Sequence, residues 1–259
     1  MTDDPWDVLA SLYDWEHADF DDDLGLYLGL ARRTGGPILE AACGTGRILL
    51  PLAEAGFRLC GLDSSQGMLA AARARLALQP RVAEAVTLVH GDLRHARLEG
   101  AFGLSIVALD SFGLLVGQTD QIAALRTLRD HLRRGGLLVV DVANGNARAW
   151  EPREEVHHHF TRPHPDSGRP LTKWVLRSTD PASQVDELTY LYDRVDEDGR
   201  VVRTVIQHPL RYFHRFELTL LLERAGLIVE DVFGDYDSSP YVSDSPRLIA
   251  IARRPDDRE

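Results

Sequence analysis

The chain has 259 residues and a formal net charge of −11 at pH 7, with 44% hydrophobic and 27% charged residues. This balance is typical of a globular protein with a sizeable core and excludes a disordered or collagen-like chain. The acidic total gives no overall basic footprint, so no nucleic acid partner is expected. No run approaches the roughly 18 apolar residues of a membrane span, so no membrane partner is expected either.

Two further features bear on the compartment. Cys43 and Cys60 are the two cysteines of the chain and cannot build a disulfide framework. The acidic start, residues 1–7, lacks the basic residues and the apolar run of a signal peptide. The expectation is therefore a cytoplasmic protein.

The first half of the chain alternates short apolar runs with helical patterns. Strands are predicted at 37–41, 58–62, 86–89, 104–109 and 136–142, and helices between them at 48–55, 66–78 and 120–132. Ser65 and Thr119 can cap the second and third of these helices, and Gly135 and Gly136 can end the third. Strands that alternate with helices predict an α/β fold with a mostly parallel sheet and helices on both faces.

The pattern changes after residue 142. Residues 143–212 lack a long helical pattern and hold alternating segments joined by the hairpin signal Asp198-Gly199. We interpret 143–212 as an antiparallel β insertion, with a substrate lid and a dimerisation surface as its alternative roles. A helix at 216–225 and strands at 227–233 and 247–252 then complete a domain formed by residues 1–142 and 213–259. Monomer and homodimer both stay open, because the insertion has an exposed strand edge.

The most informative segment runs from residue 38 to residue 47 and predicts a strand, a tight glycine turn and a helix start. Gly44 and Gly46 let the backbone turn sharply and approach a ligand without an intervening Cβ. The free N–H groups at the helix start favour an anionic or polar ligand end. Asp63, at the tip of the next strand and about 20 residues past the glycines, is placed to accept hydrogen bonds from ribose hydroxyls.

A dinucleotide site is the rival interpretation. Its fingerprint G-x-G-x-x-G requires a third glycine, and this chain has Leu49 at that position. Glu40 adds a carboxylate that would repel a pyrophosphate, and it suits an amino-acid-bearing ligand with an ammonium group better. A nicotinamide-dependent oxidoreductase is therefore the less favoured alternative.

The segment 40–46 resembles the first motif of the class I S-adenosylmethionine-dependent methyltransferases, E/D-x-G-x-G-x-G, with Ala42 in place of the first glycine. Asp63 matches the ribose-binding acid of this family. Residues 91–93 resemble its adenine-contacting segment, and 109–112 match the strand end that borders the methionine half and the substrate. The segment 12–15 resembles the entry of small-molecule members, in which an N-terminal helix covers the cofactor.

The resemblance implies a Rossmann-like, seven-stranded methyltransferase sheet with S-adenosyl-L-methionine as cofactor and S-adenosyl-L-homocysteine as product. It implies methyl transfer by direct displacement to a nitrogen or oxygen atom of a small-molecule acceptor. A non-catalytic module that binds either form of the cofactor is the alternative. The residues expected to bind the cofactor are Tyr13, Glu40, Ala41, Gly44, Thr45, Gly46, Asp63, Ser64, Met68, Gly91, Asp92, Leu93, Leu109 and Asp110.

Catalytic groups are harder to predict, because the sulfonium methyl is already activated and the protein need not supply a nucleophile. An amine acceptor must be unprotonated, whereas a hydroxyl acceptor can need a base. The candidate bases are His157, His159, Tyr212 and Asp110. No metal site is predicted in the run 157–159, since consecutive strand residues point to alternate faces.

Overall fold

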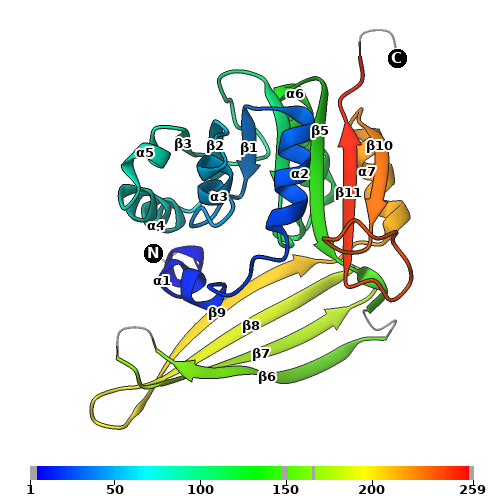
Figure 1. Ribbon diagram of the computed structural model, residues 1–259. Coiled ribbons are helices and arrows are strands. Elements are labelled where there is room, and N and C mark those ends of the chain that lie inside the picture. Colours follow the sequence, from blue (N-terminus) through cyan, green and yellow to red (C-terminus); the bar gives the residue numbers. More distant parts are fainter. Residues whose placement is uncertain (1–4, 148–150, 165–166, 257–259) are drawn as a thin grey trace.

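Two sheets organise the chain in the computed structural model, which describes residues 5–147, 151–164 and 167–256 (Figure 1). The larger sheet has seven strands, in the spatial order β10 (Ile228–Phe233), β11 (Arg247–Arg253), β5 (Leu132–Ala143), β4 (Phe102–Val107), β1 (Ile38–Ala41), β2 (Leu59–Asp63) and β3 (Val86–His90). The second sheet has four, in the order β6 (Arg153–Pro163), β7 (Pro170–Asp180), β8 (Val185–Val195) and β9 (Val201–Arg211).

The larger sheet is mixed but mostly parallel. The five strands β1 to β5 run parallel to one another. β11 is antiparallel to both of its neighbours, β5 and β10. The chain winds from β1 outward to β2 and β3 and then returns to β4 on the other side of β1. Open α/β sheets bind ligands at the carboxyl ends of strands beside such a reversal. The predicted fold class, a Rossmann-like α/β sheet followed by an antiparallel insertion, is confirmed.

Helices cover both faces of the larger sheet. α2 (Leu24–Thr34), α3 (Leu49–Glu54) and α4 (Gln66–Ala77) contribute to the core on one face. α6 (Gln118–His131) and α7 (Arg215–Arg224) contribute to the core on the other. The short elements are α5 (Pro80–Ala83), η1 (Ser111–Leu114) and η2 (Gly145–Ala147). α1 (Pro5–Glu16) lies between α4 and the second sheet and packs in a third cluster with Met68 and Tyr192 (Figure 1).

Two helix caps test the predicted boundaries. The Ser65 hydroxyl accepts a hydrogen bond from the backbone N–H of Met68 at 3.0 Å and caps α4, as predicted. Thr119 does not cap α6, because that helix begins two residues earlier than predicted and has Gly117 at its N-cap. α2 was not predicted, since Gly25 and Gly29 weaken its helical pattern and its stability comes from packing against the sheet.

The glycine pair at 135–136 also differs from its prediction. α6 ends at His131 and β5 begins directly afterwards, so both glycines lie inside the strand rather than at the helix end. Gly135 has a φ of 68°, a left-handed conformation that glycine adopts without a Cβ penalty. The bend it makes accompanies the irregular register between β4 and β5.

The insertion forms a sheet with one face turned towards the larger domain. The predicted hairpin joins β8 to β9, with Gly199 at a φ of 78°. Tyr190 and Tyr192 lie on the inner face, where Tyr192 is fully buried. Trp174 does not share this face. It is adjacent in β7 to the buried Lys173, so strand alternation turns it outward, against His158.

Within the described ranges, none of the helices combines the length and the apolar character that crossing a bilayer requires.

Candidate active site

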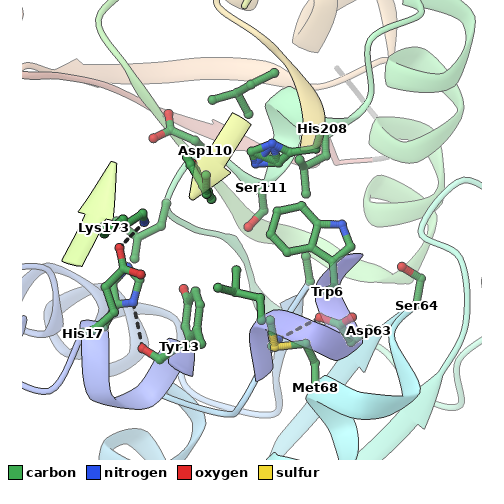
Figure 2. A pocket seen from close by; sticks show the side chains of 18 residues that line it. Trp6, Tyr13, His17, Asp63, Ser64, Met68, Asp110, Ser111, Lys173 and His208 are labelled. Atoms are coloured by element: carbon green, nitrogen blue, oxygen red, sulfur yellow. Dashed lines mark hydrogen bonds and ion pairs between the residues drawn. The ribbon is translucent and has the colours of Figure 1, made fainter. Parts of the chain in front are cut away.

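Two adjoining cavities open at the carboxyl ends of the parallel strands. The first has a volume of about 280 Å³ and the second about 270 Å³. Both are lined by Trp6, Ala42, Asp63, Ser64, Ser111 and Leu114, so they form one continuous crevice. Figure 2 shows the first cavity, with Lys173 and His17 on one side of the view and Trp6 and Asp63 on the other.

The turn after β1 forms the floor of the first cavity. Ala42, Gly44 and Gly46 have φ values of 56°, 53° and 79°, so three of five consecutive residues are left-handed. A left-handed conformation costs an L-residue roughly 1–2 kcal/mol, which explains why a glycine is usual at the position of Ala42 in the related motif. The backbone nevertheless makes the turn, and Ala42 and Gly44 both line the cavity.

Asp63, at the end of β2, is held in place by this turn. Its Oδ2 accepts a hydrogen bond from the backbone N–H of Gly44 at 2.7 Å, and its Oδ1 accepts one from Ser65 at 2.8 Å. A carboxylate has about four lone-pair sites, so these two bonds orient the group without exhausting it. The carboxylate therefore fits a ligand that brings hydroxyl donors, such as a ribose.

The second cavity lies beyond β3 and is lined by Gly91, Asp92 and Leu93. Asp92 is already engaged: Arg94 donates to it from its backbone N–H at 2.8 Å and from Nε at 2.9 Å. The hydrogen bonds from the Arg94 side chain lower the pKa of Asp92 to about 2. Asp92 therefore faces the cavity as a carboxylate that accepts hydrogen bonds and donates none.

Helix α1 covers the crevice and contacts the start of α4, the turn after β1 and the second sheet. The Asp7 carboxylate accepts hydrogen bonds from Ser65 Oγ at 2.6 Å and from the backbone N–H of Gly67 at 2.7 Å. The Thr45 hydroxyl donates to Asp14 on the same helix. At its end, Glu16 pairs with Lys173 of β7 and accepts from the Tyr192 hydroxyl at 2.7 Å. Trp6, Leu9 and Tyr13 of this helix line the first cavity.

The seat of α1 on α4 can be tested at Gly67. A Cβ at this position would lie 2.7 Å from the Cα of Asp7, so Gly67→Ala should displace α1. Because the displacement costs packing and two hydrogen bonds, the variant should bind S-adenosyl-L-homocysteine about tenfold more weakly. Gly29→Ala is the matched control, because nothing lies within 4 Å of its Cβ position. Calorimetry should show unchanged binding for the control. Equal affinity of both variants would contradict a role of α1 in covering the site.

Glu40 is a buried carboxyl within β1. It is 4% exposed, and its Oε2 has no hydrogen-bond partner among the described residues. Burial raises its pKa to about 8, although the Arg47 guanidinium acts in the opposite direction. Arg47 itself is paired with the buried Asp23, at 2.8 Å between Nη1 and Oδ1.

This raised pKa predicts a pH dependence of stability. Because the folded chain holds the Glu40 proton up to about pH 8 while the unfolded chain releases it near 4.5, stability contributed by the neutral form is lost between those values as pH rises. Above about pH 8, the free energy of unfolding of Glu40→Gln should therefore exceed that of wild type by about a few kcal/mol, the size that a pKa shift of this kind predicts. Below about pH 4.5, the two free energies should be almost equal. Urea titrations across pH measure this, with the exposed Glu54→Gln as control. A pH-independent difference would contradict the buried, uncharged carboxyl.

The ends of β4 and β5 are joined by a buried charged cluster. The fully buried Asp141 accepts hydrogen bonds from Arg247 Nε at 2.8 Å, from the Tyr236 hydroxyl at 3.0 Å and from the backbone N–H of Leu109 at 3.1 Å. Arg247 also pairs with Asp110 at 3.3 Å. Leu109 and Asp110 have φ values of 46° and 63°, so the cluster holds a strained turn that lines the first cavity.

The structure brings most of the predicted cofactor residues to this crevice. Those that line one or both cavities are Tyr13, Gly44, Asp63, Ser64, Met68, Gly91, Asp92, Leu93, Leu109 and Asp110. Glu40, Ala41, Thr45 and Gly46 do not line either cavity; they are buried beneath the turn and support it.

The predicted bases are more scattered. Asp110 lines the first cavity, whereas His157, His159 and Tyr212 line neither. His157 is exposed and bonds to Glu155 at 2.6 Å, and His159 is exposed with Glu16 at 3.9 Å. Tyr212 is buried behind the cavity wall. Among the described residues, no group of three His, Cys, Asp or Glu side chains could hold a metal ion.

Several lining residues were not predicted: Trp6, Glu16, His17, Ser111, Lys173, Tyr190 and His208. Three of them come from β7, β8 and β9, so the second sheet forms a wall of the first cavity. The sequence signal that could have found these three residues is a polar side chain at a position of an insertion strand where alternation predicts an apolar, inward-facing one. His208 and Lys173 both stand at such inward positions.

Comparison with known proteins gives the same assignment as the geometry. A family described as "Methyltransferase domain" matches residues 38–136. A putative methyltransferase of Geobacillus sp. (strain WCH70) is 32% identical over 219 residues, which cover 84% of this chain and 84% of that protein. The cypemycin N-terminal methyltransferase of Streptomyces sp is 27% identical over 228 residues, covering 85% of this chain and 84% of the relative.

Among solved structures, the CcbJ methyltransferase from Streptomyces caelestis superimposes with a TM-score of 0.77 at 24% identity, covering 91% of each chain. This likeness shows a shared fold. The chain is thus a member of the class I S-adenosylmethionine-dependent methyltransferases, and S-adenosyl-L-methionine is its cofactor.

Proposed function

We propose that this enzyme transfers the cofactor's methyl group, by direct displacement, to a nitrogen or oxygen atom of a small-molecule acceptor. The observation that carries the proposal is the first cavity, which lies between the carboxyl ends of the parallel strands and the inner face of β7, β8 and β9. A sulfonium supplies an already activated methyl group. The chain's task is then to align the acceptor and to exclude water.

The cofactor roles follow the shape of the crevice. We assign the ribose to Asp63, whose carboxylate is oriented by Gly44 and Ser65. The adenine ring is assigned to the second cavity, beside Asp92 and Leu93. Tyr13 of α1 lies at the opposite end, and we assign the carboxylate of the methionine half to it.

The acceptor side is assigned to the insertion, residues 143–212, which acts as a lid on the domain formed by 1–142 and 213–259. Lys173, Tyr190 and His208 face the first cavity from this insertion, and a half-open concave space of about 280 Å³ favours a small molecule over a polymer. The cypemycin relative is named as an N-terminal methyltransferase, which supports the nitrogen alternative.

The test is the formation of S-adenosyl-L-homocysteine. The protein is incubated with S-adenosyl-L-methionine carrying a labelled methyl group and a pooled panel of small amines and alcohols. Mass spectrometry should detect the demethylated cofactor together with a labelled acceptor. A chain that binds the cofactor but produces no demethylated cofactor above the acceptor-free control would instead be a non-catalytic binding module.

A further inference from the structure

The imidazole of His208 lines the first cavity from β9, and no described residue forms a hydrogen bond with it. The side chain is 8% exposed, and its Nδ1 has no partner among the described residues. Its ring packs 4.9 Å from Trp6 and 5.0 Å from Tyr190, measured between ring centroids. Figure 2 shows it beside Trp6. Buried polar groups are nearly always paired, so an imidazole that lines a cavity without a hydrogen-bond partner among the described residues points to a ligand that supplies one.

The carboxylates of the same cavity already have partners. Glu16 is bound by Lys173 and Tyr192. Asp110 is bound by Arg247 and the backbone N–H of Ala143. Asp63 accepts from two backbone N–H groups and lies on the cofactor side. An N–H or O–H group of the methyl acceptor on the insertion side therefore meets the His208 imidazole, a hydrogen-bond acceptor without a partner among the described residues.

The cavity also disfavours positive charge. Burial lowers the pKa values of His17, Lys173 and His208, the last to about 4, so both imidazoles are neutral near pH 7. The charged and titratable groups that line the cavity with His208 are Lys173 and Tyr190 from the insertion, Tyr13, Glu16 and His17 from α1, and Asp63 and Asp110 from the sheet ends. An amine that enters this space is shifted towards its uncharged form, which is the form that can attack.

We propose that His208 positions the acceptor, and that the acceptor is an uncharged amine whose N–H donates a hydrogen bond to this imidazole. The inference rests on the proposed methyl transfer. As the nitrogen–carbon bond forms, the carbon–sulfur bond breaks and its electron pair stays on sulfur. The positive charge passes from sulfur to nitrogen, and the proton stays on nitrogen and leaves with the ammonium product. A hydroxyl acceptor would have to give its proton to a base.

The first experiment separates this inference from the proposed function. Calorimetry measures S-adenosyl-L-homocysteine binding to wild type, His208→Phe and His208→Asn, because phenylalanine keeps the ring contacts with Trp6 and Tyr190 while asparagine keeps a polar atom near the Nδ1 position. All three should bind it within about twofold, since His208 lies on the acceptor side. Absence of binding to wild type would overturn the proposed function itself.

The second experiment uses benzylamine and benzyl alcohol, which differ in the donor group alone. They are titrated against the S-adenosyl-L-homocysteine complex and followed by NMR of the histidine ring nitrogens. Benzylamine should perturb the His208 resonances, and its affinity should rise between about pH 7 and pH 9 as its neutral fraction grows. His208→Phe should lower this affinity about tenfold, and His208→Asn should restore most of it.

His158→Phe is the matched control, because His158 lies on the outer face of the insertion against Trp174. It should leave benzylamine affinity unchanged. The inference is overturned if the alcohol binds as tightly as the amine, if benzylamine affinity does not depend on pH, or if neither probe reaches His208 in a complex that binds S-adenosyl-L-homocysteine normally.

Discussion

Arg247→Ala is expected to lower the free energy of unfolding by about 3–5 kcal/mol, the cost of leaving a buried charge without its partner. Arg247 is the cation that neutralises the fully buried Asp141 and the neighbouring Asp110. Without it, two carboxylates face each other at the end of β5. Burial already raises the pKa of Asp141, so the variant should regain part of the loss at low pH, where that carboxyl is protonated.

Urea unfolding with Arg33→Ala as control measures this effect. Arg33 is a half-exposed arginine that pairs with Glu230 at 2.7 Å, so its removal should cost no more than about 1 kcal/mol. A second replacement, Asp141→Asn in the Arg247→Ala background, should recover stability because it removes the unpaired charge. Similar losses for the two arginine variants would show that the cluster does not hold the strained turn at 109–110.

Asp63→Ala is expected to weaken S-adenosyl-L-homocysteine binding by roughly tenfold to a hundredfold, since ribose hydroxyls would lose a charged hydrogen-bond acceptor. Two backbone N–H groups, those of Gly44 and Ser65, would also lose their partner. The variant should therefore melt at a lower temperature, and the added ligand should raise its melting temperature less than that of wild type.

Calorimetry and thermal melts of Asp63→Ala are compared with those of Asp130→Ala. Asp130 is an exposed acid on α6, and its carboxylate binds the side chain of the neighbouring Arg129. Its removal should change neither affinity nor the ligand-induced rise in melting temperature. Unchanged affinity in Asp63→Ala would remove this carboxylate from the cofactor site.

Local sequence patterns predict most of the residues that line the crevice we assign to the cofactor. The glycines at 44 and 46 and the acid at 63 follow directly from strands β1 and β2, and chain order alone brings neighbouring parallel strand ends together. The departure at Ala42 is tolerated, since the backbone takes the left-handed conformation there without a glycine.

The acceptor half could not be predicted in the same way. Strand alternation can place Lys173 and His208 on the inner face of the inserted sheet, but no local pattern tells that this face packs against the carboxyl ends of the larger sheet. The run of three histidines at 157–159 suggested candidate bases, but these residues lie on the edge strand β6 and line neither cavity. The strand register determines which side chains of the insertion face the cavity, since the adjacent residues Lys173 and Trp174 face opposite sides of β7.

The most direct test of the central claim is a calorimetric titration of the wild-type chain with S-adenosyl-L-homocysteine and, separately, with a nicotinamide dinucleotide. The crevice between Gly44, Asp63 and Asp92 predicts saturable binding of the first ligand at one site per chain and no binding of the second. Binding of the dinucleotide without binding of S-adenosyl-L-homocysteine would contradict the assignment of this crevice to a methyl donor.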